Sequence, residues 1–114
     1  MRSIDDHHDG HELNESIAIN ADELGPGGAS HKYACWIQSG QAALIQFQEG
    51  PRNELGSIPG ITEAVLYAIL IDRLRGFQAG PYACRENAIQ LTKLEECLHW
   101  TKARADARAK RGVL

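Results

Sequence analysis

Side chains suited to nucleotide recognition lie near the predicted breaks in this chain. Arg52 follows the end of a predicted strand, where a guanidinium can bind a phosphate in bidentate fashion. Phe77 and Tyr82 flank the Gly-Pro break at 80–81, and an aromatic ring at such a corner can stack on a base. Asn87 offers a donor and an acceptor that match the edge of adenine. Composition leaves open that Phe77 is a core residue and that Asn87 is a polar residue at a helix start.

Catalytic and metal-binding signatures are absent from the sequence, which contains no GxSxG, HExxH or Walker motif. His99 has no evident Ser or Cys nucleophile, and the adjacent Glu95 and Glu96 point to different sides of a helix. The histidines and acids of 5–11 have no spacing that fixes a closed ligand geometry, and the three cysteines lack CxxC spacing. We therefore expect a protein that is not an enzyme, that has no cofactor or metal, and that keeps its cysteines reduced.

Charge is distributed unevenly along the chain. The first 30 residues are rich in acids, while the remainder is net positive and ends in a basic segment at 102–111. A basic C-terminal segment on an otherwise nearly neutral body of the chain indicates an anionic partner. Basic side chains are also favourable at the C-terminus of a helix, whatever the partner. The sequence shows no run of about 18 apolar residues and no apolar segment of a signal peptide. We therefore expect a cytoplasmic protein without a membrane partner.

Hydrophobic periodicity predicts an α+β fold, in which a small antiparallel β-hairpin or sheet is followed by a long antiparallel α-helical hairpin. The first 30 residues contain few large apolar side chains, so we expect them to be disordered. Thr62 is the predicted N-cap of the first helix, and Gly112 with the apolar Val113 is the predicted end of the second. These expectations divide the chain into a tail at 1–30 and a ligand-binding domain at 31–114, with strands in about 31–49 and helices over about 62–78 and 83–111.

Both predicted helices carry an apolar stripe. In the first helix, the stripe comprises Val65, Leu66, Ile69, Leu70, Leu74 and Phe77. In the second, Leu91, Leu94 and Leu98 recur at helical spacing in line with Asn87. The second helix, at 1.5 Å per residue, is about 42 Å long and overhangs the first, which has roughly 17 residues. A second copy of the chain can cover the overhanging stripe, so we expect a homo-oligomer, either a dimer or a higher assembly such as a hexamer.

Several segments, taken in their order, resemble a known family. They read QFQEGPR at 46–52, DRLRGFQ at 72–78, GPYACRENA at 80–88, LTKLEE at 91–96 and RGV at 111–113. Over roughly 25–114 the chain resembles the phage Thoeris anti-defence proteins of the first described type, which are related to anti-CBASS sponges. The resemblance implies a non-catalytic sponge that holds a cyclic ADP-ribose isomer intact and blocks Thoeris signalling in the cytoplasm of the infected bacterial host. Related members also bind cyclic di- and trinucleotides of CBASS immunity at separate sites.

The resemblance also implies ligand-binding positions. Matched residue by residue, they fall on Arg52, Phe77, Asn87 and Arg104, and on Lys32, where the chain departs from the family pattern. Asn87 and Arg104 are separated by 17 residues of one predicted helix, or about 25 Å along its axis. A ligand of mononucleotide size cannot reach both from one chain. If both bind the same molecule, they come from different subunits, as two antiparallel long helices would allow.

Two other functions remain open on the sequence. A nucleic-acid-binding module would use the basic C-terminal helix, and its binding would weaken steeply with rising salt. The small positive charge of the body is low for such a protein. An enzyme that hydrolyses the signal would need a nucleophile or a metal that the sequence does not show. Such an enzyme would return product after denaturation, whereas a sponge would return the intact ligand.

Overall fold

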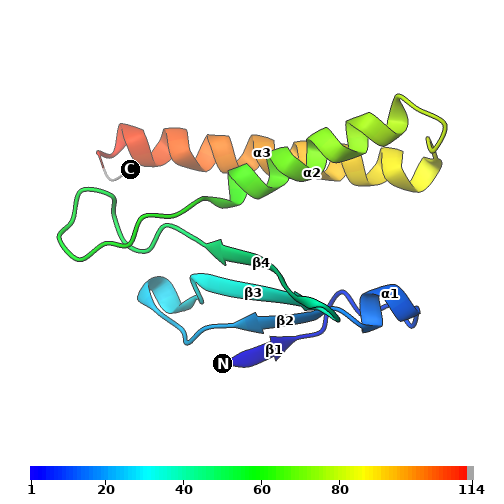
Figure 1. Ribbon diagram of the computed structural model, residues 1–114. Coiled ribbons are helices and arrows are strands. Elements are labelled where there is room, and N and C mark those ends of the chain that lie inside the picture. The colour runs from blue at the N-terminus through cyan, green and yellow to red at the C-terminus, as the bar shows by residue number, and fades with distance from the viewer. Residues whose placement is uncertain (113–114) are drawn as a thin grey trace. The chain divides into compact units, whose positions relative to one another are not determined.

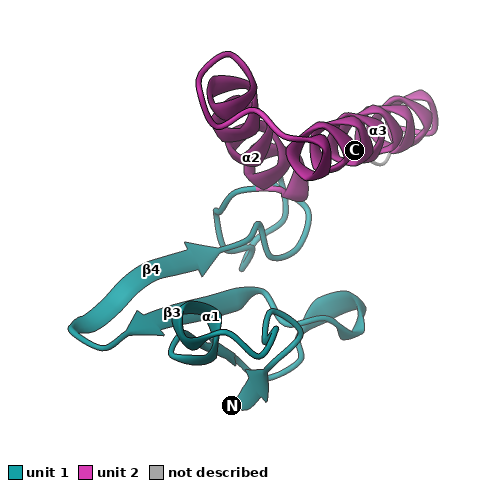
Figure 2. Cartoon of the chain, turned by 90° about the vertical axis from the view of Figure 1, so that its right-hand side faces the viewer, with its two compact units in different colours: residues 1–61 teal, residues 62–114 magenta. Residues whose placement is uncertain are grey.

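The computed structural model describes residues 1–112, which form two compact units (Figure 2). Unit 1 is Met1–Ile61 and unit 2 begins at Thr62, so the chain divides after Ile61 instead of after residue 30. The predicted α+β class, with a small antiparallel sheet followed by long helices, is confirmed. The elements in chain order are β1 (Arg2–Ile4), α1 (Glu12–Glu15), β2 (Ala18–Ala21), the 3₁₀ helix η1 (Pro26–Gly28), β3 (Lys32–Ile37), β4 (Gly40–Gln46), α2 (Glu63–Gln78) and α3 (Arg85–Lys110).

The strands of unit 1 form one antiparallel sheet in the order β1-β2-β3-β4 (Figure 1). The predicted hairpin is the β3–β4 half of this sheet. Tyr33 pairs with Ile45, and its ring meets that of Phe47 edge-on with the centroids 5.8 Å apart. The turn lies at 38–39, and Gly40 opens β4 with a φ of 134°, which favours glycine.

The expectation of a disordered tail over 1–30 is wrong, because this segment builds β1, α1, β2 and η1. Ala21 of β2 is fully buried, and Ser30 is 5% exposed with its hydroxyl donating to the Asp22 carbonyl at 2.8 Å. The segment is too polar to form a core of its own. The edge of β3 that does not face β4 nevertheless forms backbone hydrogen bonds with β2. An argument from composition does not include the stability that these hydrogen bonds add.

The connections of unit 1 depend on glycines at two places. The predicted break at 25–28 is a 3₁₀ turn that joins β2 to β3, so it does not separate a tail from a domain. Gly60 approaches the backbone of Gln46 and Phe47 so closely that a Cβ would overlap it. This contact closes the long loop after β4, and the loop carries Arg52.

In unit 2, α2 and α3 form the predicted helical hairpin (Figure 1), and their ends lie within two residues of the predicted ones. Thr62 occupies the predicted N-cap position, although its side chain makes no capping hydrogen bond. Gly112 has the left-handed φ expected at the end of α3, 73°. The apolar contact predicted for Val113 lies outside the described residues. Local signals, namely the caps and the break between the helices, were therefore sufficient to locate both helices.

One face of α3 packs on α2, as its stripe predicts. The half-buried residues of α3 up to position 98 are Asn87, Leu91, Leu94 and Leu98. An ion pair also joins the two helices, in which Arg75 Nη2 lies 2.8 Å from Glu95 Oε2. Asn87 thus belongs to the face that the hairpin partly covers.

The core of the hairpin is small, and the predicted stripe of α2 is partly wrong. Among the described residues of unit 2, only Ile71 and Leu74 are buried, at 3% and 9% exposure. Ile71 was not in the predicted stripe, whereas Val65, Ile69 and Leu70 were and are 41%, 58% and 46% exposed. Because α2 is apolar around most of its circumference, periodicity does not select the face that packs. No helix in residues 1–112 has both the length and the apolar character needed to cross a membrane.

Candidate functional site

Phe77 and Asn87 belong to the two helix ends that the turn of the helical hairpin joins. Phe77 is in the last turn of α2, and Asn87 is in the first turn of α3. Residues 79–84 join the two helices, and both side chains are half-buried. An aromatic ring and a side-chain amide are therefore presented at one end of unit 2.

The amide of Asn87 is oriented by a neighbour on the same helix. Gln90 Nε2 donates to Asn87 Oδ1 at 3.3 Å, which is the contact expected for residues three apart on a helix. With this oxygen accepting from Gln90, the Nδ2 group of Asn87 can donate to an acceptor on a ligand, such as a ring nitrogen of adenine.

One face of the Phe77 ring is occupied by an arginine. The Arg73 Cζ atom lies 5.0 Å from the ring centroid, which is a cation–π contact between residues four apart on α2. This contact leaves the guanidinium with N–H donors for an anion next to the ring. Sequence analysis did not identify Arg73 or Gln90. Their spacing was a usable signal, because Arg73 lies four residues before Phe77 and Gln90 lies three residues after Asn87.

Arg104 lies at the other end of the hairpin. It is exposed on α3 and about 25 Å along the helix from Asn87. It lines a groove of about 640 Å³ formed where the start of α2 lies against the second half of α3. Residues of that groove include Thr62, Glu63, Trp100, Lys102, Arg104 and Arg108. Within one chain the structure therefore does not bring Arg104 to Phe77 and Asn87.

The two remaining predicted positions belong to unit 1. Lys32 is exposed at the start of β3, where it pairs with Gln46 of β4. Arg52 is exposed in the loop after β4, next to a turn in which the Glu54 amide donates to the Pro51 carbonyl at 3.0 Å. Each side chain is accessible to an anionic ligand, and neither belongs to the helical hairpin.

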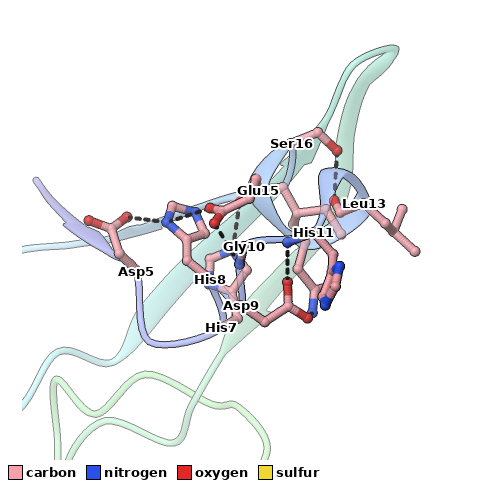
Figure 3. A network of polar contacts seen from close by, with 11 residues as sticks. Asp5, His7, His8, Asp9, Gly10, His11, Leu13, Glu15 and Ser16 are labelled. Atoms are coloured by element: carbon pink, nitrogen blue, oxygen red, sulfur yellow. Dashed lines mark hydrogen bonds and ion pairs between the residues drawn. The ribbon is translucent and has the colours of Figure 1, made fainter.

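The histidine-rich segment at 5–11 is an ordered polar network (Figure 3). His8 Nδ1 lies 3.2 Å from Glu15 Oε2 and 4.0 Å from Asp5 Oδ1. Asp9 accepts from the His11 amide at 3.0 Å. These contacts tie the β1–α1 connection to α1. Within residues 1–112, no group of three or more His, Cys, Asp or Glu side chains is arranged to hold a metal ion.

Neither the cysteines nor His99 form a catalytic pair in the described residues. Cys35, Cys84 and Cys97 are all free thiols. His99 stands edge-on to Trp100, with the ring centroids 5.4 Å apart, on an exposed part of α3. The side chains at the predicted positions are an aromatic ring, an amide and cations, which are groups that can bind a nucleotide.

Comparison with known proteins agrees with this description. Residues 40–106, more than half of the chain, match the family model of the Acb2/Tad1 hairpin domain. The matched range includes four of the predicted positions, Arg52, Phe77, Asn87 and Arg104. The chain is also 43% identical over 89 residues to "Thoeris anti-defense 1" of Bacillus phage SBSphiJ7. That alignment covers 78% of this chain and 62% of the relative's length. The chain therefore belongs to the Acb2/Tad1 hairpin-domain family.

Proposed function

We propose that this protein is a phage anti-defence sponge that binds a cyclic ADP-ribose isomer and holds it intact, so that bacterial Thoeris signalling is blocked in the infected host cell. Membership of the hairpin-domain family and the likeness to a Thoeris anti-defence protein support an anti-defence role. The observation that supports the binding proposal is that Phe77 lies in the last turn of α2 and Asn87 in the first turn of α3, on either side of the hairpin turn. A ring face stacks a base, while an amide reads its edge. The same chemistry extends to cyclic di- and trinucleotides.

Arg52, Arg104 and Lys32 are the cationic side chains that we propose as phosphate ligands. A cyclic ADP-ribose isomer carries a pyrophosphate, for which a guanidinium is well suited because it forms bidentate hydrogen bonds. Arg104 lies about 25 Å from Asn87 along α3, so it serves the ligand held by a second copy of the chain. The site is thus complete only in a homo-oligomer.

The surface of unit 2 supports this oligomer. The hairpin buries only Ile71 and Leu74 among its described residues, and it leaves Ile69 58% and Trp100 69% exposed. A second copy of the chain can cover such apolar side chains, which the hairpin itself leaves exposed. A two-fold axis that sets two α3 helices antiparallel would bury part of this surface and bring each Asn87 toward the partner's Arg104.

Heat release distinguishes the sponge from an enzyme. We expect purified protein, incubated with a panel of ribose-linked cyclic ADP-ribose isomers and then washed, to release at least one isomer unchanged when it is denatured by heat. Chromatography with mass detection identifies what is released, and each isomer heated alone serves as the control. Release of a ring-opened product would contradict sequestration. Retention of no isomer would contradict the proposed function itself.

Phe77→Ala is expected to weaken ligand binding by about 1–3 kcal/mol, the usual contribution of base–aromatic stacking. Titration calorimetry with the retained isomer measures the change. Tyr67→Ala is the matched control, because Tyr67 is a half-buried aromatic residue of the same helix and lies about 15 Å along its axis from Phe77. A fall in the unfolding temperature of Phe77→Ala with unaltered affinity would show that Phe77 serves only the hairpin core.

A further inference from the structure

The side chain of Gln78 forms a bidentate clamp on the turn between α2 and α3. Its Nε2 donates to the Cys84 carbonyl at 3.2 Å, and its Oε1 accepts from the Cys84 amide at 3.0 Å. Gln78 is the last residue of α2, and Cys84 is the N-cap of α3. One side chain thus ties the end of one helix to the beginning of the next.

The clamp supplies what the turn otherwise lacks. Cys84 makes no side-chain capping hydrogen bond. Its carbonyl, which accepts from Gln78 Nε2, also accepts from the Ala88 amide at 3.1 Å. Within 79–84, the backbone adds an Ala83-to-Gly80 hydrogen bond of 3.4 Å. The two hydrogen bonds between Gln78 and Cys84 therefore connect the end of α2 directly to the start of α3.

The clamp also limits the hydrogen bonds that the Asn87 side chain can form. Asn87 is the third residue of α3, the position whose side chain reaches back to the N-cap amide in a capping box. Here that amide already donates to Gln78, while the Asn87 oxygen accepts from Gln90. The Nδ2 group of Asn87 is left to a ligand.

We propose that Gln78 is a positioning residue for the base-binding half of the site: it sets Phe77 against Asn87 and keeps the Asn87 amide turned away from the N-cap. The inference rests on the proposed function. Phe77 immediately precedes the clamp, and Asn87 is one turn beyond it, so the two groups that would contact a base are fixed through Gln78. Small misplacements of such groups weaken recognition strongly.

Two variants of Gln78 test this role. Gln78→Met keeps the length and helix propensity of the side chain but removes both hydrogen bonds, and we expect affinity for the retained cyclic ADP-ribose isomer to fall roughly tenfold. Gln78→Glu keeps an acceptor for the Cys84 amide but, when ionised, places an oxygen against the Cys84 carbonyl. Its affinity relative to the unaltered protein should therefore rise as pH falls toward about 4.3, where a carboxyl regains a proton to donate. Gln41→Met and Gln41→Glu on β4 are the matched controls, and they should leave the affinity and its pH profile unchanged.

Three measurements distinguish a positioning role of Gln78 from a role in stability and from failure of the proposed function: circular dichroism, the unfolding temperature and ligand affinity. Circular dichroism and the unfolding temperature report whether each variant keeps its helices, and the pH profile of Gln78→Glu is informative even if Gln78→Met unfolds. Equal affinity of the unaltered protein and Gln78→Met, or a Gln78→Glu profile that follows the unaltered protein, would overturn the positioning role alone. Failure of the unaltered protein to retain any cyclic ADP-ribose isomer would instead overturn the proposed function, and this inference with it.

Discussion

Asn87→Trp is expected to abolish ligand capture while leaving the fold intact. An indole in place of the amide would remove the donor proposed to read the base edge and would add bulk at the position of the proposed ligand. The substitution should be tolerated because Asn87 is only half-buried and the helix propensities of Asn and Trp are similar. Equilibrium dialysis against the retained cyclic ADP-ribose isomer, with circular dichroism on the same sample, measures both properties.

Matched variants sharpen this result. Asn87→Asp preserves the shape of the side chain but replaces the donor with an acceptor, so it should also lose most of its binding. Thr92→Trp adds the same indole at an exposed position of α3 and should bind normally. Capture by Asn87→Trp at unchanged affinity would remove Asn87 from the site.

Mixing Asn87→Trp and Arg104→Ala chains is expected to restore binding that neither variant has alone. If each pocket takes Asn87 from one chain and Arg104 from another, a homogeneous sample of either variant has a lesion in every pocket. After random re-association, roughly a quarter of the pockets combine an intact Asn87 with an intact Arg104. Ligand retention per chain should therefore recover to about a quarter of that of the unaltered protein.

Exchange of subunits has to be verified for this experiment, and distinct affinity tags on the two variants make mixed oligomers recoverable. A mixture of Asn87→Trp with Phe77→Ala chains is the matched control, because both residues lie at the same end of one hairpin. That mixture should show no recovery beyond the residual binding of Phe77→Ala. Verified exchange without recovery in the Asn87→Trp and Arg104→Ala mixture would mean that the two residues do not share a ligand.

Much of unit 2 could be predicted because its signals are local. A Gly-Pro break, a Thr at the N-cap and a Gly at the C-terminal end mark both helices, and Leu91, Leu94 and Leu98 mark the packed face of α3. The face of α2 could not be predicted, since apolar residues cover most of its circumference and only packing selects Ile71 over Ile69. The candidate binding residues could be identified from sequence motifs and residue types. Arg73, Gln78 and Gln90 were identified from the side-chain contacts that they make in the structure.

The sequence by itself determined, to within two residues, where the helices begin and end, and the order of its motifs indicated the family to which the chain belongs. Tertiary structure alone decided that residues 1–30 complete the sheet, because β2 pairs with the edge of β3 and buries Ala21, and neither contact can be read from the composition of the segment. It also placed Arg104 beside the start of α2, at the opposite end of the hairpin from Phe77. Helix geometry gives the distance between two residues of one helix, but it does not show which residues a neighbouring helix contacts. Those contacts are decided only when the helices pack.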